Sequence, residues 1–233
     1  MGLRLRLLRE FALEDSGRRI DVPVGTQRLI AFLALRGPSH RCFVAGMLWP
    51  EVPESQALAS LRTGVWRMNR ARTGCLVSTG TQLGIPADVA IDTDEHEVFT
   101  TGLLREHLED EEWITARSEV LWRGELLPGW YDDWVVFERE RLHQLRLHAL
   151  EYLAALMARH HDLPAALHLA LEAVRAEPLR ESANARLIEV YLAEGNVCDA
   201  LRQYDAFRAL LDRELGLEPS VRLRRLLPAL PAR

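Results

Sequence analysis

One amphipathic stretch, residues 53–72 (PESQALASLRTGVWRMNRAR), restricts the fold of this chain more than any other. At ~3.6 residues per turn, its large apolar side chains fall on one stripe of a helix, at Leu58, Leu61, Val65 and Met68. Such a stripe must pack against a core. The opposite side holds hydrogen-bond donors, namely Gln56, Ser60, Thr63, Arg67 and Arg70, with Arg62 and Trp66 on one flank. The sequence therefore predicts a helix with one buried side and one basic, exposed side.

The segments on either side of this helix indicate a winged helix-turn-helix. Before it, residues 41–49 form a shorter helical pattern, and Pro50 and Pro53 break the chain so that the second helix starts in a new direction. After it, residues 75–85 (CLVSTGTQLGI) fit two short strands joined by a turn at Gly80, which tolerates positive φ. In this motif the second helix enters the major groove, and the hairpin, or wing, meets phosphates.

The candidate DNA contacts therefore lie on the exposed side of the second helix and on the wing. They are Arg67, Arg70, Thr63, Ser60, Gln56, Arg62, Thr79 and Thr81. Arg67 and Arg70 rank first, because a guanidinium group can bridge the edge of a guanine or hold a phosphate. The alternatives are surface ion pairs for these arginines, an acidic partner in the second domain for Arg62, and simple turn chemistry for the wing threonines.

Length and charge predict two domains. The 233 residues exceed the usual size of a single domain, and we place the boundary between residues 1–93 and 94–233. Residues 1–91 contain 12 arginines and 7 acidic residues, a balance of +5, whereas residues 92–233 contain 17 arginines and 27 acidic residues, a balance of −10. A basic first domain favours DNA as a partner, and an acidic second domain is repelled by it.

The composition excludes several classes of protein. With 48% hydrophobic and 27% charged residues, and without a long apolar run, the chain reads as a globular protein with no membrane association. The first residues (MGLRLRLLREF) interleave charges with leucines, which argues against a signal peptide and favours the cytoplasm. The three cysteines are far apart, and His160, His161 and His168 have no further ligand at metal-binding spacing. We expect no metal, no cofactor and, without a G-x-S-x-G or H-E-x-x-H motif, no enzyme activity.

The remainder of the first domain reads as a small sheet and a scaffold helix. Residues 3–14 and 18–24 both alternate, which predicts a hairpin around residues 15–17. Thr26 can cap a helix that ends at Gly37-Pro38, and residues 86–94 close the domain.

The second half of the chain has a helical pattern throughout. Residues 96–107 and 111–122 predict a helix pair, and Asp132 and Asp133 can cap a long helix that runs to His161. Residues 163–167 then recur at an offset of 34 as residues 197–201, which is the tetratricopeptide period. Two alanines, Ala166 and Ala200, fall where paired helices approach closely. Residues 215–220 end the array before a short terminal helix.

In combination these features resemble the Streptomyces antibiotic regulatory proteins, which join an OmpR-like winged helix to a bacterial transcriptional activator domain. In the first domain the matching segments are Thr26-Gln27-Arg28-Leu29, Leu48-Trp49-Pro50 and Leu61-Arg62-Thr63. In the second they are Leu126-Leu127-Pro128-Gly129, Asp132-Asp133-Trp134, Glu138-Arg139-Glu140-Arg141-Leu142, Pro178-Leu179-Arg180-Glu181, Ala200-Leu201-Arg202-Gln203-Tyr204 and Glu214-Leu215-Gly216-Leu217-Glu218-Pro219. The expected fold class is therefore mostly α with a small β component, an OmpR-like winged helix-turn-helix followed by an all-α, tetratricopeptide-like repeat domain.

The resemblance implies a transcriptional activator that binds direct repeats in promoter DNA and recruits RNA polymerase with its sigma factor. It also implies self-association on DNA and a target in secondary metabolism, such as an antibiotic biosynthesis cluster. Larger relatives add an ATP-hydrolysing domain; this chain has no G-x-x-x-x-G-K-S/T loop and resembles the small, two-domain form. The alternative function is a helical-repeat adaptor, for protein interaction or ligand sensing, whose winged helix no longer binds DNA.

Overall fold

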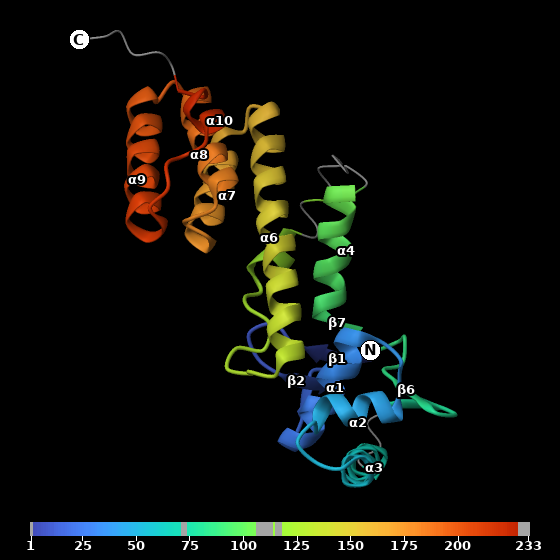
Figure 1. Cartoon of the computed structure of the whole chain (residues 1–233). Coiled ribbons are helices and arrows are strands. Elements are labelled where there is room, and N and C mark those ends of the chain that lie inside the picture. The colour runs from blue at the N-terminus through green and yellow to red at the C-terminus, as the bar shows by residue number, and fades with distance from the viewer. Residues whose placement is uncertain (1, 71–73, 106–113, 115–117, 228–233) are drawn as a thin grey trace, which may run out of the picture. The chain divides into compact units, whose positions relative to one another are not determined.

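The computed structural model describes residues 2–70, 74–105, 114 and 118–227. The chain forms two compact units, Met1–Phe99 with Arg117–Leu142 (unit 1) and Thr100–Ala116 with His143–Arg233 (unit 2). Figure 1 labels their helices and strands. No helix within the described residues is long and apolar enough to cross a membrane.

Four strands form one sheet of unit 1, in the order β3-β2-β1-β7. They are β1 (Leu3–Arg6), β2 (Ala12–Asp15), β3 (Arg18–Ile20) and β7 (Ala90–Ile91). The predicted turn at residues 15–17 is present, with a φ of 83° at Gly17. The prediction that residues 3–14 form one arm of a hairpin is wrong. They form the antiparallel strands β1 and β2, because the intervening loop turns the chain back and holds Arg9 at a φ of 71°.

Three helices follow in unit 1: α1 (Val24–Arg36), α2 (Arg41–Leu48) and α3 (Glu54–Arg70). The predicted cap at Thr26 is wrong, since this side chain is buried and the helix already begins at Val24. Instead, the carbonyl oxygen of Pro23 accepts hydrogen bonds from the amides of Thr26 and Gln27. The predicted stop at Gly37 is confirmed, with a φ of 72° at that residue.

The buried side of α3 agrees with the predicted stripe. Leu61, Val65 and Met68 are buried, whereas Leu58 is only partly buried. Gly64 extends the stripe because it lets α1 approach closely: a Cβ atom there would lie 3.4 Å from the Leu29 Cδ2 atom. The helix therefore packs on the core through this side and leaves the opposite side exposed.

The wing is present as β5 (Val77–Thr79) and β6 (Gln82–Gly84), joined through Gly80 at a φ of 60°. A short strand that the sequence analysis missed, β4 (Ser39–His40), pairs with β6 and makes a three-stranded sheet in the order β4-β6-β5. Because β4 leads directly into α2, the wing is tied to the start of the helix-turn-helix.

The helix α4 (Asp92–Arg105) begins directly after β7 and thus earlier than the predicted start at His96. Its first residue explains this start. The buried carboxylate of Asp92 accepts hydrogen bonds from the backbone amides of Leu7 and Leu8, at 2.9 and 3.0 Å. Of the second predicted helix at 111–122, only Ile114 and the 3-10 helix η1 (Ser118–Trp122) belong to the described residues, and the acidic run at 109–112 lies outside them.

The first turns of the long helix α6 (Asp133–Arg159) belong to unit 1. Trp134, which is 2% exposed, packs edge-on against Phe32 of α1 with ring centroids 5.3 Å apart. Asp132 was expected to cap α6, but its carboxylate instead accepts a hydrogen bond from Arg28. Arg139 fixes the preceding loop by donating to the carbonyl oxygens of Leu126, Leu127 and Trp130 at 2.7 to 2.9 Å.

Because of these contacts, the two compact units do not coincide with the domains expected at residues 1–93 and 94–233. Unit 1 does not end at residue 93 but also contains the start of α4 and the start of α6. The division of function between residues 1–93 and 94–233 stays a prediction.

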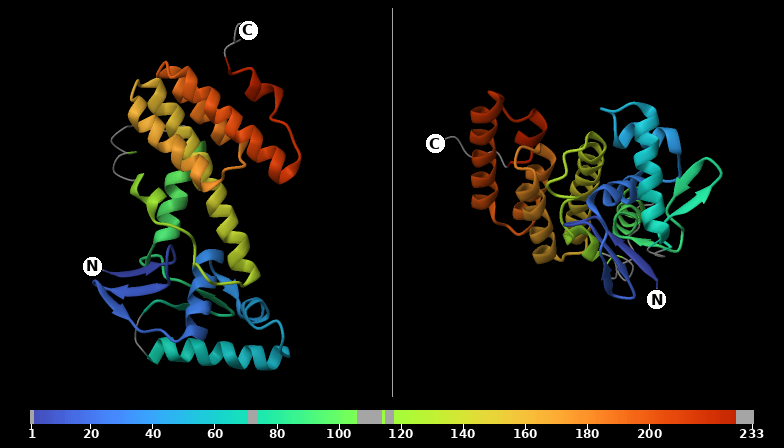
Figure 2. Two further views of the ribbon diagram at one scale, coloured as in Figure 1. Left: turned by 90° about the vertical axis from the view of Figure 1, so that its left-hand side faces the viewer. Right: turned by 90° about the horizontal axis from the view of Figure 1, so that it is seen from below.

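Unit 2 is built from α6 and four further helices, α7 (Leu163–Ala176), α8 (Glu181–Ala193), α9 (Val197–Leu215) and α10 (Val221–Arg224). Figure 2 shows α7, α8 and α9 packed side by side as helical hairpins. Ala166 and Ala200, the alanines that recur at the 34-residue offset, are both fully buried. This agrees with the close helix approach predicted there.

An arginine joins α6 to the loop before α8 in unit 2. The Nε atom of Arg180 lies 2.6 Å from the Glu151 carboxylate, and its Nη1 atom donates to the Gln144 side-chain oxygen at 2.7 Å. The Arg180 and Glu151 side chains are 17% and 13% exposed. Because both groups are largely withdrawn from water, removing either one leaves a poorly solvated partner.

We predict that Leu61→Asp prevents stable folding of unit 1, because it removes a buried side chain and places an unpaired carboxylate in the core. The cost should exceed about 3 kcal/mol. Circular dichroism melting measures it, with Thr63→Asp on the exposed side of α3 as the control. A Leu61→Asp variant that melts like the control would mean that the buried and exposed sides of α3 are reversed.

We predict that Arg180→Gln destabilises unit 2 by about 3 kcal/mol, because Glu151 loses its partner in a largely buried place. The control is Arg202→Gln, since the Arg202 side chain is 79% exposed and its ion pair with Asp199 is a surface pair. That control should cost at most about 0.5 kcal/mol. Urea unfolding compares the two, and equal midpoints would contradict the structural role of Arg180.

Candidate nucleic-acid interface

The exposed side of α3 carries the predicted side chains. Gln56, Arg62, Thr63, Arg67 and Arg70 are exposed, and Ser60 is partly buried. Among the residues that the structure describes, no ion pair or hydrogen bond involves the guanidinium groups of Arg62 and Arg67. Their donors therefore face solvent, which is the arrangement that base edges or phosphates require.

Arg70 lies over the ring of Trp66, one turn earlier on α3, with 5.1 Å between the guanidinium carbon and the ring centroid. This cation–π contact is worth about 0.5–1 kcal/mol at an exposed site and restricts the orientation of Arg70. Trp66 is 57% exposed, so its ring covers no core. Sequence reasoning left Trp66 on the flank of the site, although its spacing of four residues from Arg70 signals a side-chain pair on one helix face.

The smaller polar residues of α3 differ in how much of their hydrogen-bonding capacity is left for a DNA contact. The Thr63 hydroxyl donates to the carbonyl oxygen of Ala59 at 3.0 Å, so its proton is used within the helix and only its oxygen remains as an acceptor. Gln56 is exposed near the start of the helix. Ser60 is nearer the core than expected.

Two basic residues that sequence reasoning missed contact the wing from β4 and α2. Arg41, the first residue of α2, donates to the Ser78 hydroxyl at 3.0 Å, and the His40 ring lies 3.2 Å from the Thr81 hydroxyl. Thr81 is thus already in contact with the scaffold, whereas Thr79 is exposed at the end of β5. The only sequence signal for His40 and Arg41 was their place at the start of the predicted helix 41–49, since β4 is too short to show a strand pattern.

The arginines of the four-stranded sheet differ from those of α3, because several of them have carboxylate partners. Arg6 lies 2.9 Å from Glu14, and Arg19 lies 3.1 Å from Glu10. Positive charge on β1 and β3 is therefore partly neutralised, while that of Arg62 and Arg67 is not. Among the described residues, the exposed side of α3 thus carries positive charge that no carboxylate pairs with.

In the part of the chain that the structure describes, no group of three or more histidine, cysteine, aspartate or glutamate side chains could hold a metal ion.

Comparison with known proteins gives matches over most of the chain. Residues 105–230 match the family model of the bacterial transcriptional activator domain. The chain is 31% identical over 212 residues to the regulatory protein AfsR of Streptomyces coelicolor, which covers 82% of this chain and 20% of that protein. It is 31% identical over 218 residues to AfsR of Streptomyces griseus, with the same coverage. The chain spans about a fifth of the length of these curated relatives.

A solved structure with the same fold is that of Mycobacterium tuberculosis EmbR in complex with a low-affinity phosphopeptide. The TM-score is 0.79 at 21% sequence identity, and the match covers 96% of this chain and 63% of that one. This likeness agrees with the predicted fold class, mostly helical with a small β component.

Proposed function

The chain belongs to the family of regulators that contain a bacterial transcriptional activator domain, that of the Streptomyces antibiotic regulatory proteins, and from this premise we propose that it is a sequence-specific DNA-binding transcriptional activator. Transcriptional regulators are not an enzyme class, which agrees with the lack of catalytic motifs. The target we propose is a promoter of a secondary-metabolite gene cluster.

The observation that carries this proposal is the exposed side of α3. Arg62 and Arg67 have no partner among the described residues, and Arg70 is held by Trp66 on the same helix. We assign base contacts to Arg67 and Arg70, and supporting contacts to Arg62, Gln56, Thr63 and Ser60. Thr79 and Thr81, with Arg41, are the proposed phosphate contacts of the wing.

We assign sequence recognition to residues 1–93. The rest of unit 1 is needed because it completes the core on which these residues pack. All candidate DNA contacts precede residue 93, but the core beneath them includes Trp134. A fragment that ends at residue 93 would expose Phe32, so the shortest fragment we expect to bind DNA extends to residue 142.

The acidic second half is proposed to contact protein: RNA polymerase with its sigma factor, and a second copy of the chain on DNA. Its charge balance of −10 over residues 92–233 disfavours a second DNA-binding surface. Unit 2 also exposes Leu215, Leu217 and Val221, each more than half exposed, near the end of α9. Apolar side chains grouped in this way are typical of protein contacts.

We predict that Arg67→Ala and Arg70→Ala each weaken binding to the target promoter while the fold is retained, with a loss of stability of at most about 1 kcal/mol for Arg70→Ala from its contact with Trp66. A lost base contact costs ~1–3 kcal/mol and relaxes specificity, whereas a lost phosphate contact lowers the slope of affinity against salt by about one unit. Titrations at several salt concentrations separate the two outcomes. The control is Arg18→Ala, an exposed arginine on β3. Promoter binding that neither α3 variant alters would mean that the exposed side of α3 does not read the DNA sequence.

We predict that two copies bind head to tail to direct repeats about one helical turn apart, ~10–11 base pairs from centre to centre. Inserting half a turn between the repeats places the copies on opposite sides of the duplex and should abolish cooperativity. Inserting a full turn is the control and should restore part of it. Cooperativity that survives the half-turn insertion would exclude a contact between neighbouring copies.

A further inference from the structure

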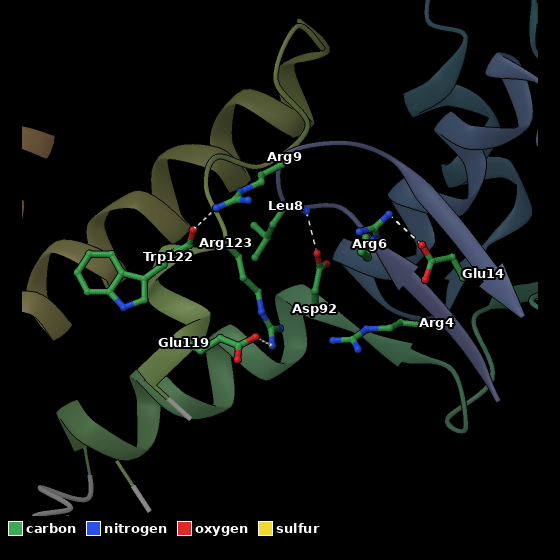
Figure 3. Close-up of a pocket in the computed structure, with 9 residues that line it drawn as sticks. All are labelled: Arg4, Arg6, Leu8, Arg9, Glu14, Asp92, Glu119, Trp122 and Arg123. Atoms are coloured by element: carbon green, nitrogen blue, oxygen red, sulfur yellow. Dashed lines mark hydrogen bonds and ion pairs between the residues drawn. The ribbon is translucent and has the colours of Figure 1, made fainter. Parts of the chain in front are cut away.

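Unit 1 contains a cavity that the DNA-binding proposal does not use. It lies between the sheet, the start of α4 and the segment around η1, and Figure 3 shows its lining. The volume is about 390 Å³, within the range of small-molecule sites. The lining residues are Arg4, Arg6, Leu8, Arg9, Glu14, Asp92, Glu119, Trp122 and Arg123. Four of these nine residues are arginines, so guanidinium groups make up a large part of the polar lining.

Asp92, the buried acid of the cavity, forms no ion pair with Arg4 or Arg9 in the described part of the chain, although the positive charge of Arg123 acts on it. Both carboxylate oxygens of Asp92 are occupied by the amides of Leu7 and Leu8, and the residue is 3% exposed. Burial raises the pKa of Asp92 above its usual value, while the amides of Leu8 and Leu7 and the charge of Arg123 act in the opposite direction. Its function is to tie the start of α4 to the end of β1.

The remaining carboxylates are distributed unevenly among the guanidinium groups, since Glu14 pairs with Arg6 at 2.9 Å and none of those described pairs with Arg9. A single oxygen of Glu95, Oε2, serves both Arg123 and Arg4, and the Arg4 contact is long, at 3.5 Å. Glu119 lies 3.8 Å from Arg123 and is 84% exposed, so it contributes little. Arg4 is therefore weakly paired, although its side chain lines the cavity.

Arg9 has no carboxylate partner among the described residues, although it is held firmly in place. Its Nη2 atom donates to the carbonyl oxygen of Trp122 at 2.7 Å, and its backbone adopts a φ of 71°. Its side chain passes over Gly124, where a Cβ atom would lie 2.7 Å from the Arg9 Cγ atom. In Figure 3 the Arg123 side chain extends between Arg9 above and Arg4 below. A guanidinium that is fixed but not neutralised has donors left for a ligand.

We propose that this cavity binds a small organic or inorganic anion through a carboxylate or phosphate group, with Arg9 and Arg4 as its direct partners. The planar fork of a guanidinium group matches both kinds of oxyanion. The volume limits the ligand to a small molecule. This site lies apart from α3, and its existence does not depend on the proposed DNA-binding function.

The test is isothermal titration calorimetry on the full chain with inorganic phosphate in one series and succinate in another. We expect saturable binding of at least one anion with one site per chain, and the series that binds identifies the head group. Arg9→Gln and Arg4→Gln should each weaken binding at least about tenfold, because each removes a charge-assisted contact. Arg18→Gln, an exposed arginine of β3 outside the cavity, is the matched control and should leave binding unchanged.

Two results would overturn the proposal. The first is that neither anion binds at concentrations up to about 10 mM, which corresponds to less than about 3 kcal/mol of binding free energy and would mean that the arginines form only a structural ion-pair network. The second is binding that all three variants weaken equally, since this would be a response to net charge. Circular dichroism verifies the fold of each variant, and should Arg9→Gln fail to fold, the comparison of Arg4→Gln with Arg18→Gln decides the question.

Discussion

Unit 1 depends on the contact between Phe32 of α1 and Trp134 of α6. Both side chains are almost fully buried, and their rings meet edge-on at 5.3 Å. On either side of this contact an ion pair joins the same two segments, Arg28 with Asp132 and Arg36 with Glu138. Burial of two aromatic rings removes a large apolar area from water, and the ion pairs add orientation. The start of α6 is therefore part of the winged-helix core.

Most of the segments that match the family have a structural role. The matching segments Asp132-Asp133-Trp134 and Glu138-Arg139-Glu140-Arg141-Leu142 contribute core and loop contacts, including the three carbonyl oxygens that Arg139 binds. Likewise, Arg180 of the segment Pro178-Leu179-Arg180-Glu181 joins elements within unit 2. Most of these residues position the fold, and Leu61-Arg62-Thr63 is the one matching segment on α3, where we propose the DNA contacts.

The arginines of unit 1 separate into three groups that differ in their partners. Those near Phe32 and Trp134 pair with acidic residues of the same unit, as Arg28 does. Those on α3 face solvent, with Arg70 oriented by Trp66. Those around the cavity are paired unevenly, since Arg9 has no carboxylate partner among the described residues and Arg4 has only a long contact with Glu95. The same side chain thus serves as a structural tie, a proposed DNA contact and a proposed anion ligand, according to the acids that surround it.

The sequence by itself determined the buried and exposed sides of α3 and the close helix approach at Ala166 and Ala200, because both follow from the periodicity of the sequence. It also determined the hairpin turns at Gly17 and Gly80, because glycine adopts positive φ readily. Only the tertiary structure decided the extent of unit 1, the pairing of β4 with the wing, the use of Asp132 as an ion-pair partner and the cavity around Arg9. Each of these depends on contacts between residues far apart in the chain, and periodicity within one segment carries no information about which distant segment will cover it.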